Sequence, residues 1–318
     1  MNENVIVSVI IPTYNRSSLL MDSLRSVEQQ SLRNLECIII DDGSTDDTED
    51  IVNIFIEKDS RFKYFKRSAE YTKGACGSRN MGFDLSIGKY IQYLDDDDLL
   101  SRDKLELQVN KLEDQKSKDV FTTCDWDVYW ENKDFEPKNI FNKNSIIFPS
   151  QYLDIIYKNE SYIPHHAFLI PRHIIGTAGG WSTELLINAD AEFIIRILIN
   201  CDYLINTKKC YVLYRLHNAD RMSSNFNSKS TESLIQGFKL MQTHLKSKSI
   251  NNDAFFKWKL NRILLAYWKK EKNILLSNSE FFAEHGIYLS LTKFYFFKAY
   301  IYKMTYPIVK KMRVNIKN

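Results

Sequence analysis

The chain has 318 residues, of which 44% are hydrophobic and 26% charged, with 10 Gly and 6 Pro. These values fit one large or two modest globular domains and exclude a collagen-like or largely disordered protein. The five cysteines are scattered without CxxC spacing, so we expect a reducing compartment, with neither a disulfide framework nor a zinc site. We see no signal-peptide pattern and no run of about 18 apolar residues. The expected location is cytoplasmic, either soluble or peripheral on the inner face of the cell membrane.

The first 110 residues alternate strand and helix patterns. Continuous apolar runs rich in β-branched residues are typical of strands buried on both faces of a sheet. The predicted strands cover 5–11, 35–40, 62–65 and 90–94, and helices are expected to be capped by Ser17, Thr45 and Ser101. Such alternation predicts an α/β fold in which a parallel sheet carries helices on both faces. Ligands then bind at the carboxyl ends of the strands.

The pattern from residue 120 to about 214 is looser. Short apolar runs at 120–124 and 211–215 surround a polar stretch at 133–143. We expect them to form the other half of the same domain, with an edge hairpin and the side that binds a second substrate. The chain after residue 225 is predicted to be helical, with core residues at helical spacing: Phe256, Leu260, Ile263, Leu264 and Tyr267.

The net charge of +3 hides an asymmetry along the chain. Residues 255–318 contain 13 basic and 3 acidic residues, whereas the rest of the chain contains 30 basic and 37 acidic residues. The segment 293–318 holds seven basic residues, several aromatic residues and no acidic one. It is either a helix that packs its aromatic residues on the main domain or a surface that lies on an anionic membrane. Nucleic-acid binding is not expected, because the remainder is acidic.

Four acidic residues, 95–98, directly follow the strand predicted at 90–94. Adjacent carboxylates repel one another, so they need a cation or a solvated turn. In an extended segment, Asp95 and Asp97 would point the same way and could together hold a hard divalent cation. A solvated turn without a ligand is the alternative. The position at the end of a buried strand favours the cation site.

Other interpretations of these acidic residues can be tested by spacing. An EF-hand fails because Ile38 and Ile40 stand where acidic residues should precede Gly43. A haloacid-dehalogenase-like phosphatase would use Asp95 as nucleophile and Asp97 as acid, and it stays the second candidate. Dinucleotide binding is not expected, since no GxGxxG follows the first strand.

Two further polar groups follow predicted strands or turns. Asp41 and Asp42 end the second strand, where a carboxylate can accept a hydrogen bond from the N–H of a base and select uracil. For Thr45 and Asp46 we expect helix capping instead. Arg79 follows the turn GACGS and could reach a diphosphate as a fork of donors.

With these clusters in order, the chain resembles the family 2 glycosyltransferases, which have the GT-A fold. The matching segments are VSVIIPTYNR (7–16), IIIDDGSTDDT (38–48), GACGSRNMG (74–82), GKYIQYLDDDDLL (88–100), GGW (179–181) and DAEFIIR (190–196). The resemblance implies a GT-A domain over 1–225, with a nucleotide-binding half at 1–118 and an acceptor half at 119–225. Residues 226–318 would be a helical, basic C-terminal extension.

The resemblance also implies roles on the donor side. The nucleoside would be held by a short segment after the first strand, made of Pro12, Thr13, Tyr14 and Asn15. Tyr14 would lie against the base, and Asp42, with Asp41 beside it, would accept from uracil. Arg79 would contact the diphosphate or the ribose side, and Asp96 the ribose.

For catalysis, the resemblance points to Asp190 as the base, with Glu192 as the fallback. Ala189 stands where the family usually has an acidic residue, which removes a neighbour that could help to bind the acceptor. Asp97 is the first choice as ligand of Mg²⁺ or Mn²⁺, with Asp95 beside it. His217 is a weaker candidate.

Three aromatic residues remain. Trp181 resembles the family's aromatic residue under the acceptor, and core packing is the alternative. His165 and His166 follow a proline in an apolar stretch and are expected to be structural.

The implied reaction is the inverting transfer of a sugar from a nucleotide diphosphate donor, usually UDP-linked, to a hydroxyl group. An inverting displacement needs one base and positive charge on the leaving diphosphate, and no covalent nucleophile. The acceptor is expected to be a glycan or a lipid-linked glycan of a bacterial surface polysaccharide. A non-catalytic protein that binds nucleotide sugars is a further alternative, although such a protein has no need of Asp190.

Overall fold

The computed structural model describes residues 5–129, 140–141, 146–216 and 227–289. Its main sheet has five strands in the order β3-β2-β1-β4-β8. The strands are β1 (Val7–Thr13), β2 (Leu35–Asp41), β3 (Phe62–Lys66), β4 (Tyr90–Tyr93) and β8 (Ile170–Pro171). The first four are parallel, and β8 runs antiparallel to β4. Every residue of β1, β2 and β4 is buried, which explains why their sequences are mostly apolar.

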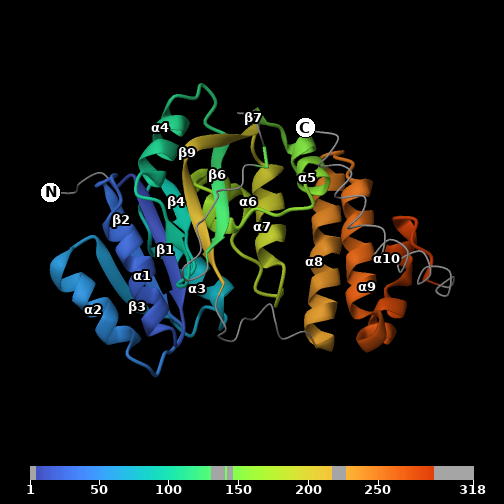
Figure 1. The fold of residues 1–318 in the computed structure, drawn as a ribbon, viewed down its shortest axis with the longest axis horizontal. Coiled ribbons are helices and arrows are strands. Elements are labelled where there is room, and N and C mark those ends of the chain that lie inside the picture. Colours follow the sequence, from blue (N-terminus) through green and yellow to red (C-terminus); the bar gives the residue numbers. More distant parts are fainter. Residues whose placement is uncertain (1–4, 130–139, 142–145, 217–226, 290–318) are drawn as a thin grey trace.

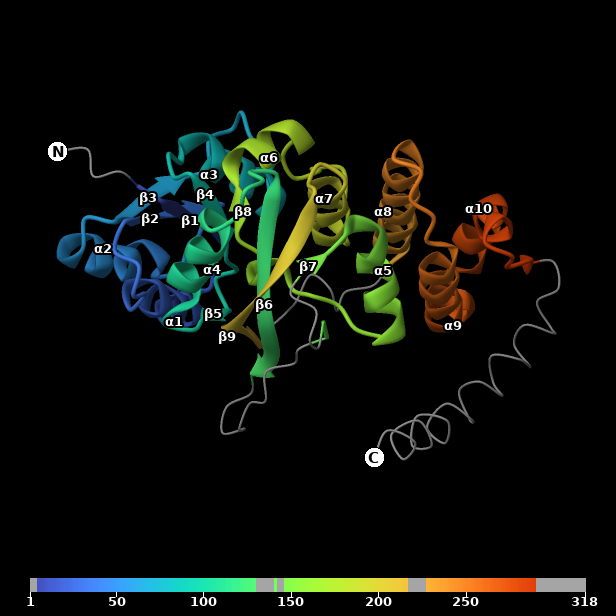
Figure 2. The same cartoon turned by 90° about the horizontal axis from the view of Figure 1, so that it is seen from above.

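Helices cover both faces of this sheet, as the alternating pattern predicts. Figure 2 shows α3 (Ala75–Leu85) on one side and α1 (Ser17–Glu28) with α2 (Thr48–Lys58) on the other. Gly82 of α3 lies directly over Ile10 of β1, where a Cβ atom would stand 2.4 Å from the Ile10 side chain. This close approach needs glycine, and it holds α3 tightly against the strands whose ends carry the acidic residues.

Three of the expected helix caps are wrong. Helix α1 begins at Ser17 itself, α2 at Thr48 and α4 (Lys104–Glu113) at Lys104, and none has a side-chain hydrogen bond from its cap residue. Asp46 caps two helices instead. Its carboxylate accepts hydrogen bonds from the backbone N–H of Ser17, in α1, and of Thr48, in α2. The capping role expected for Asp46 is therefore confirmed.

A second sheet stands beside the first (Figure 1). Its order is β5-β9-β6, and β7 also pairs with β9. The strands are β5 (Leu99–Leu100), β6 (Val120–Tyr129), β7 (Ile146–Ile147) and β9 (Tyr203–Arg215). Strands β6 and β9 pair in parallel. The two apolar runs therefore pair with each other across the domain instead of forming a hairpin, and residues 133–139 of the polar stretch lie outside the described residues.

The remaining elements are helices that extend the domain at one end. They are α5 (Pro149–Lys158), the 3-10 turn η1 (His165–Ala167), α6 (Arg172–Ala178), α7 (Ala189–Leu198), α8 (Ser228–Ser247), α9 (Asp253–Ser277) and α10 (Ser279–Glu284). In both views α8 lies beside α7 and α9 beside α8 (Figures 1 and 2). The core residues predicted for α9 are buried, apart from Tyr267, which is partly buried.

None of the described helices combines the length and the apolar character needed to cross a bilayer. The basic segment 293–318 lies outside the described residues.

Candidate functional site

The predicted site residues of the segments 12–15, 41–42 and 95–97 lie at the carboxyl ends of neighbouring parallel strands. Thr13 ends β1 and is in register with Asp41, which ends β2. The acidic residues 95–98 follow β4, the neighbour of β1 on its other side. Because parallel strands end at the same edge of a sheet, segments that are far apart in sequence meet there.

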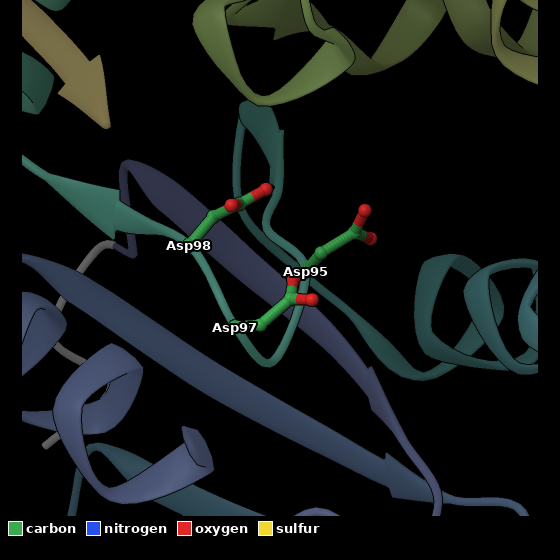
Figure 3. A group of neighbouring side chains, drawn as sticks. All are labelled: Asp95, Asp97 and Asp98. Carbon is green, nitrogen blue, oxygen red and sulfur yellow. The ribbon is translucent and has the colours of Figure 1, made fainter. Parts of the chain in front are cut away.

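The acidic segment 95–98 is a turn between β4 and β5, not the extended segment expected from the sequence. The backbone N–H of Asp98 donates to the carbonyl of Asp95, which closes the turn. Asp95, Asp97 and Asp98 each place a carboxylate oxygen within 4.8 Å of the others (Figure 3). The turn brings Asp95 and Asp97 together as expected, and it adds Asp98, for which the sequence indicated no role.

Asp95 is held by two cationic or polar partners. Arg79 donates a hydrogen bond to its Oδ1, and Nε2 of His165 lies 3.3 Å from the same oxygen. Burial alone would raise the pKa of Asp95, but His165 and Arg79 outweigh it and hold that pKa well below its usual range. Asp95 is therefore a carboxylate at neutral pH.

Asp96 and Asp97 share Arg16, a residue for which the sequence indicated no role. One guanidinium nitrogen of Arg16 lies 3.0 Å from Asp96 and 2.9 Å from Asp97. Asp96 also accepts from the hydroxyl of Thr13 at 2.8 Å. Burial raises the pKa of Asp96 to about 7, although Arg16 opposes the shift. These contacts tie Asp96 to the end of β1 and engage its carboxylate with the protein's own groups.

Asp98 connects the turn to two distant parts of the chain. Its side chain is fully buried, with one oxygen 3.0 Å from Nδ1 of His166 and the other accepting from the backbone N–H of Arg215 at 2.8 Å. Burial raises the pKa of Asp98, and His166 opposes the shift. Asp98 thereby fixes the turn against η1 and the end of β9.

The donor set suits a hard divalent cation. Carboxylate oxygens are the ligands preferred by Mg²⁺ and Mn²⁺ in proteins. The side chains of Asp95 and Asp97 are 28% and 13% exposed, so both can be reached from solvent, whereas Asp98 is closed off. We therefore regard Asp95 and Asp97 as the residues that fit the cation. His217 lies outside the described residues.

The segment after β1 presents an aromatic ring to solvent. Tyr14 is 47% exposed, and Nζ of Lys73 lies 5.6 Å from its ring centroid. Pro12 and Thr13 are buried in the strand, so of this group Tyr14 is best placed to lie against a base. Asn15 adopts a left-handed conformation and its side-chain oxygen accepts from the backbone N–H of Thr45 at 2.7 Å. That bond joins the loop after β1 to the loop after β2.

The two acidic residues after β2 have different surroundings. Asp41 is buried and accepts from two backbone N–H groups, from the hydroxyl of Ser44 and from that of Tyr64. Its Oδ1 atom is engaged by the turn and its Oδ2 atom by Tyr64 of β3. Asp42 accepts from Arg67 and from the backbone N–H of Gly74 at 2.8 Å. Arg67, for which the sequence gave no signal, therefore competes with a base for Asp42.

Trp181 is a buried residue that supports Arg79. Its ring stacks on Phe193 with the centroids 4.4 Å apart, and the guanidinium of Arg79 lies 4.3 Å from its centroid. The side chain of Asn80, next to Arg79 in α3, bonds both the backbone N–H and the carbonyl of Trp181. These contacts favour the packing alternative for Trp181.

Glu192, the fallback base, is enclosed in an ion-pair network. Its carboxylate accepts two hydrogen bonds from Arg196, at 2.6 and 2.9 Å, and Nε2 of His244 lies 3.0 Å away. Arg196 in turn donates to the carbonyls of residues 178, 179 and 180. Glu192 thus holds the turn before Trp181, and its oxygens are engaged by α7 and α8.

Asp190 stands at the exposed start of α7 and lines a cavity of about 190 Å³. Burial would lower the pKa of Arg79, and the charges of Asp95 and, more weakly, Asp190 raise it instead. On the other side, burial lowers the pKa of Lys259 to about 8, and Asp190 partly opposes that shift. Asp190 is therefore close enough to interact electrostatically with Arg79, the partner of Asp95, and with Lys259 of the cavity.

Comparison with known proteins identifies the family and the fold. The model of glycosyl transferase family 2 matches residues 8–177. An uncharacterized glycosyltransferase of Rickettsia conorii is 45% identical over 108 residues, which are 34% of this chain and 17% of the relative. An Escherichia coli protein, named as a UDP-Glc:alpha-D-GlcNAc-diphosphoundecaprenol beta-1,3-glucosyltransferase, is 38% identical over 43% of this chain and 51% of its own. The matches thus span about half or less of these relatives.

The fold has a solved counterpart in the 1–349 fragment of S. aureus TarS, crystallised with UDP-GlcNAc. The TM-score is 0.64 at 20% identity, over 84% of this chain and 74% of that one. This likeness concerns the fold, which is the GT-A fold that the sequence predicts. Because the family model covers more than half of the chain, from β1 through the acidic turn to α6, the chain belongs to glycosyl transferase family 2.

Proposed function

We propose that this chain transfers a sugar from a UDP-sugar to a hydroxyl group of a glycan or lipid-linked glycan, with inversion at the anomeric carbon. The observation that carries the proposal is the position of Asp190. It lines a cavity on one side, and its charge acts on Arg79, the partner of Asp95, on the other. A carboxylate between a donor edge and a cavity is where a base for the acceptor hydroxyl is needed.

On the donor side, we propose that Tyr14 and Asp42 bind the uracil ring of the nucleotide. The diphosphate would lie near Arg79. Tyr14 offers an exposed ring, and stacking on a ring fits any flat base. Asp42 already accepts hydrogen bonds from Arg67 and Gly74. It would give up one of these hydrogen bonds to accept one from the N–H of uracil. Arg79, pressed onto Trp181, is held in one orientation and could present its remaining N–H groups to phosphate.

For the cation, we propose Asp95 and Asp97 as ligands. Bound there, Mg²⁺ or Mn²⁺ would neutralise the charge that develops on the departing diphosphate. Arg16 and Arg79 already bring positive charge to the same carboxylates. The hydrogen bond that closes the turn and the burial of Asp98 fix the positions of these two carboxylates before a cation binds.

The acceptor class is inferred from the relatives. The E. coli relative is named for an acceptor in which a sugar is joined to a lipid through diphosphate. We propose an acceptor of that class for this chain, used at the inner face of the cell membrane. The basic segment 293–318 would bring the enzyme to anionic lipids.

The alternatives differ in what they require of the site. A phosphatase would use Asp95 as the nucleophile, but Arg79 and His165 both contact its Oδ1 atom and leave only Oδ2 for attack on a phosphate. A protein that only binds nucleotide sugars has no use for a base, whereas Asp190 is exposed in the cavity.

The test is UDP release from UDP-Glc, UDP-GlcNAc and UDP-Gal, with and without Mn²⁺. The acceptor is GlcNAc joined through diphosphate to an undecyl chain. Proton NMR of the product reads the anomeric configuration. We expect release that depends on acceptor and metal, with inversion. Phosphate release from simple phosphomonoesters would favour the phosphatase, and UDP-sugar binding without transfer to any glycan acceptor would favour the binding protein.

A further inference from the structure

The cavity beside Asp190 is built largely from the helices that follow the matched family segment. It lies where α5, η1 and α7 meet α8 and α9, and its volume is about six times the ~30 Å³ that one water molecule occupies in the liquid. Figures 1 and 2 show how α8 and α9 close this end of the domain. The residues that define its chemistry are Tyr152, Asp190, Ile194, Phe238, Phe255 and Lys259.

The walls are mostly apolar, and few charged groups enter the cavity. Phe238 of α8 and Phe255 of α9 are buried against each other, with centroids 6.4 Å apart, and Ile194 of α7 is buried nearby. The polar lining includes Asp190 at the side toward Arg79 and Lys259 on α9. A few converging polar groups on an apolar wall are the usual composition of a small-molecule site.

Lys259 is a cation without an anionic partner among the described residues. Its Nζ lies 4.5 Å from the centroid of the Trp258 ring and 5.8 Å from that of Phe255, and it makes no hydrogen bond or ion pair there. Asp190 lines the same cavity but forms no ion pair with it. Burial lowers the pKa of Lys259 to about 8, helped by Arg262, so at neutral pH it still carries its proton. A partly buried ammonium with only ring contacts keeps its donors available for a ligand.

We propose that α8 and α9 complete the acceptor site, and that Lys259 binds an anionic group of the acceptor while Asp190 faces the reacting hydroxyl. The shared chemistry is a phosphate or carboxylate attached to the sugar that carries the hydroxyl. The inference rests on the proposed function, because it assumes that Asp190 is the base. It adds a residue that sets acceptor specificity and lies outside the matched family segment, 8–177.

An anion would be attracted to this cavity by the charge of Lys259. The Asp190 carboxylate would repel an anion, so the charge of Lys259 is required to offset it. Hydrogen bonds to a charged partner are about twice as strong as neutral ones, and in an apolar cavity they distinguish a charged acceptor from its neutral analogue. The rings of Trp258 and Phe255 hold the lysine side chain along the wall.

The test is direct binding, which does not depend on transfer. Three probes carry the same undecyl chain and a GlcNAc-type sugar. One is linked through diphosphate, one is the neutral undecyl glycoside, and one is the undecyl glycoside of the corresponding uronic acid. Affinities are measured by tryptophan fluorescence on the full chain with UDP and Mn²⁺ present. The variants are Lys259→Met, Lys259→Arg and, as a matched control on the same helix, Lys257→Met, whose side chain is exposed.

We expect the wild-type protein to bind at least one charged probe about tenfold or more tightly than the neutral one. Lys259→Met should lose that preference, while Lys259→Arg and Lys257→Met keep it. Preference for the diphosphate or for the uronate identifies the source of the anion. Two results would overturn the proposal. One is equal affinity of the wild type for all three probes, and the other is an equal loss of affinity for charged and neutral probes in Lys259→Met. Failure of the proposed function is seen separately, as absence of UDP binding or of UDP release from any UDP-sugar.

Discussion

Glu192 and Arg196 form a two-bond ion pair one turn apart on α7, and the pair supports the turn that carries Trp181. Both side chains are largely buried, at 3% and 12% exposed. The pair engages the carboxylate of Glu192, which is why we propose Asp190 rather than Glu192 as the base.

Glu192→Gln should lower the free energy of unfolding by about 3 kcal/mol, because it leaves Arg196 and His244 without their buried carboxylate. Urea denaturation followed by circular dichroism measures this, with the exposed Glu57→Gln as control. A variant of unchanged stability that has lost sugar transfer would instead identify Glu192 as the base.

Asp190→Asn should reduce transfer by about 10²- to 10⁴-fold and leave UDP affinity within a factor of two. The amide cannot accept the proton of the acceptor hydroxyl, while the donor contacts are on other elements. Steady-state UDP release and UDP binding are measured side by side, with the exposed Glu184→Gln as control. A large loss of UDP affinity in Asp190→Asn would remove it as the base.

Asp97→Asn should abolish the effect of Mn²⁺ on UDP binding, since the carboxylate charge is what a hard cation requires. Titrations of UDP at several Mn²⁺ concentrations measure the linkage, with the exposed Asp114→Asn as control. If UDP binding by Asp97→Asn still strengthened with Mn²⁺ as in the wild type, Asp97 would not be a ligand.

Tyr14→Ala should weaken UDP binding by about 10- to 100-fold, because stacking of a base on an aromatic side chain contributes roughly 1–3 kcal/mol. Tyr14→Phe keeps the ring and should bind UDP like the wild type. Because Tyr14 is exposed, neither change should shift the thermal midpoint. If Tyr14→Ala bound UDP as tightly as the wild type, the uracil ring would not lie against Tyr14.

The affinity for a diphosphate-linked acceptor should fall as pH rises above about 8. Burial, aided by Arg262 and opposed by Asp190, lowers the pKa of Lys259 to about 8. The protonated form binds the anion, so affinity is full below this pKa and declines by up to about tenfold per pH unit above it. Fluorescence titrations between about pH 6.5 and 9.5 test this. Lys259→Met should show no such decline, and a wild-type profile equally flat would contradict the assignment.

Local sequence was sufficient for the four parallel strands of the main sheet, although not for the antiparallel β8. Apolar runs predicted β1 and β2 because most positions of a strand buried on both faces are apolar; the exceptions inside the runs, Ser8 and Glu36, are buried and hydrogen-bond to each other. The same strands end at Thr13 and Asp41, so the polar residues that follow the apolar runs mark the edge of the sheet where the site lies.

Other features depend on contacts between segments that lie far apart in the chain. Asp98 has its role because Arg215, 117 residues later, and His166 reach it from β9 and η1. The caps expected at Ser17 and Thr45 were wrong because Asp46 reaches the starts of α1 and α2 from a loop. Lys259 gave no local signal, since its position in the cavity is set by the packing of α9 on α5 and α8.

The central claim is a metal-linked UDP site at the ends of β1, β2 and β4. It is tested most directly by the thermal midpoint of the wild-type chain with UDP, GDP, TDP or AMP, each with and without Mn²⁺. We expect a rise in midpoint for UDP that requires Mn²⁺ and little change for the other three nucleotides. The same small response to all four nucleotides, with or without Mn²⁺, would contradict it.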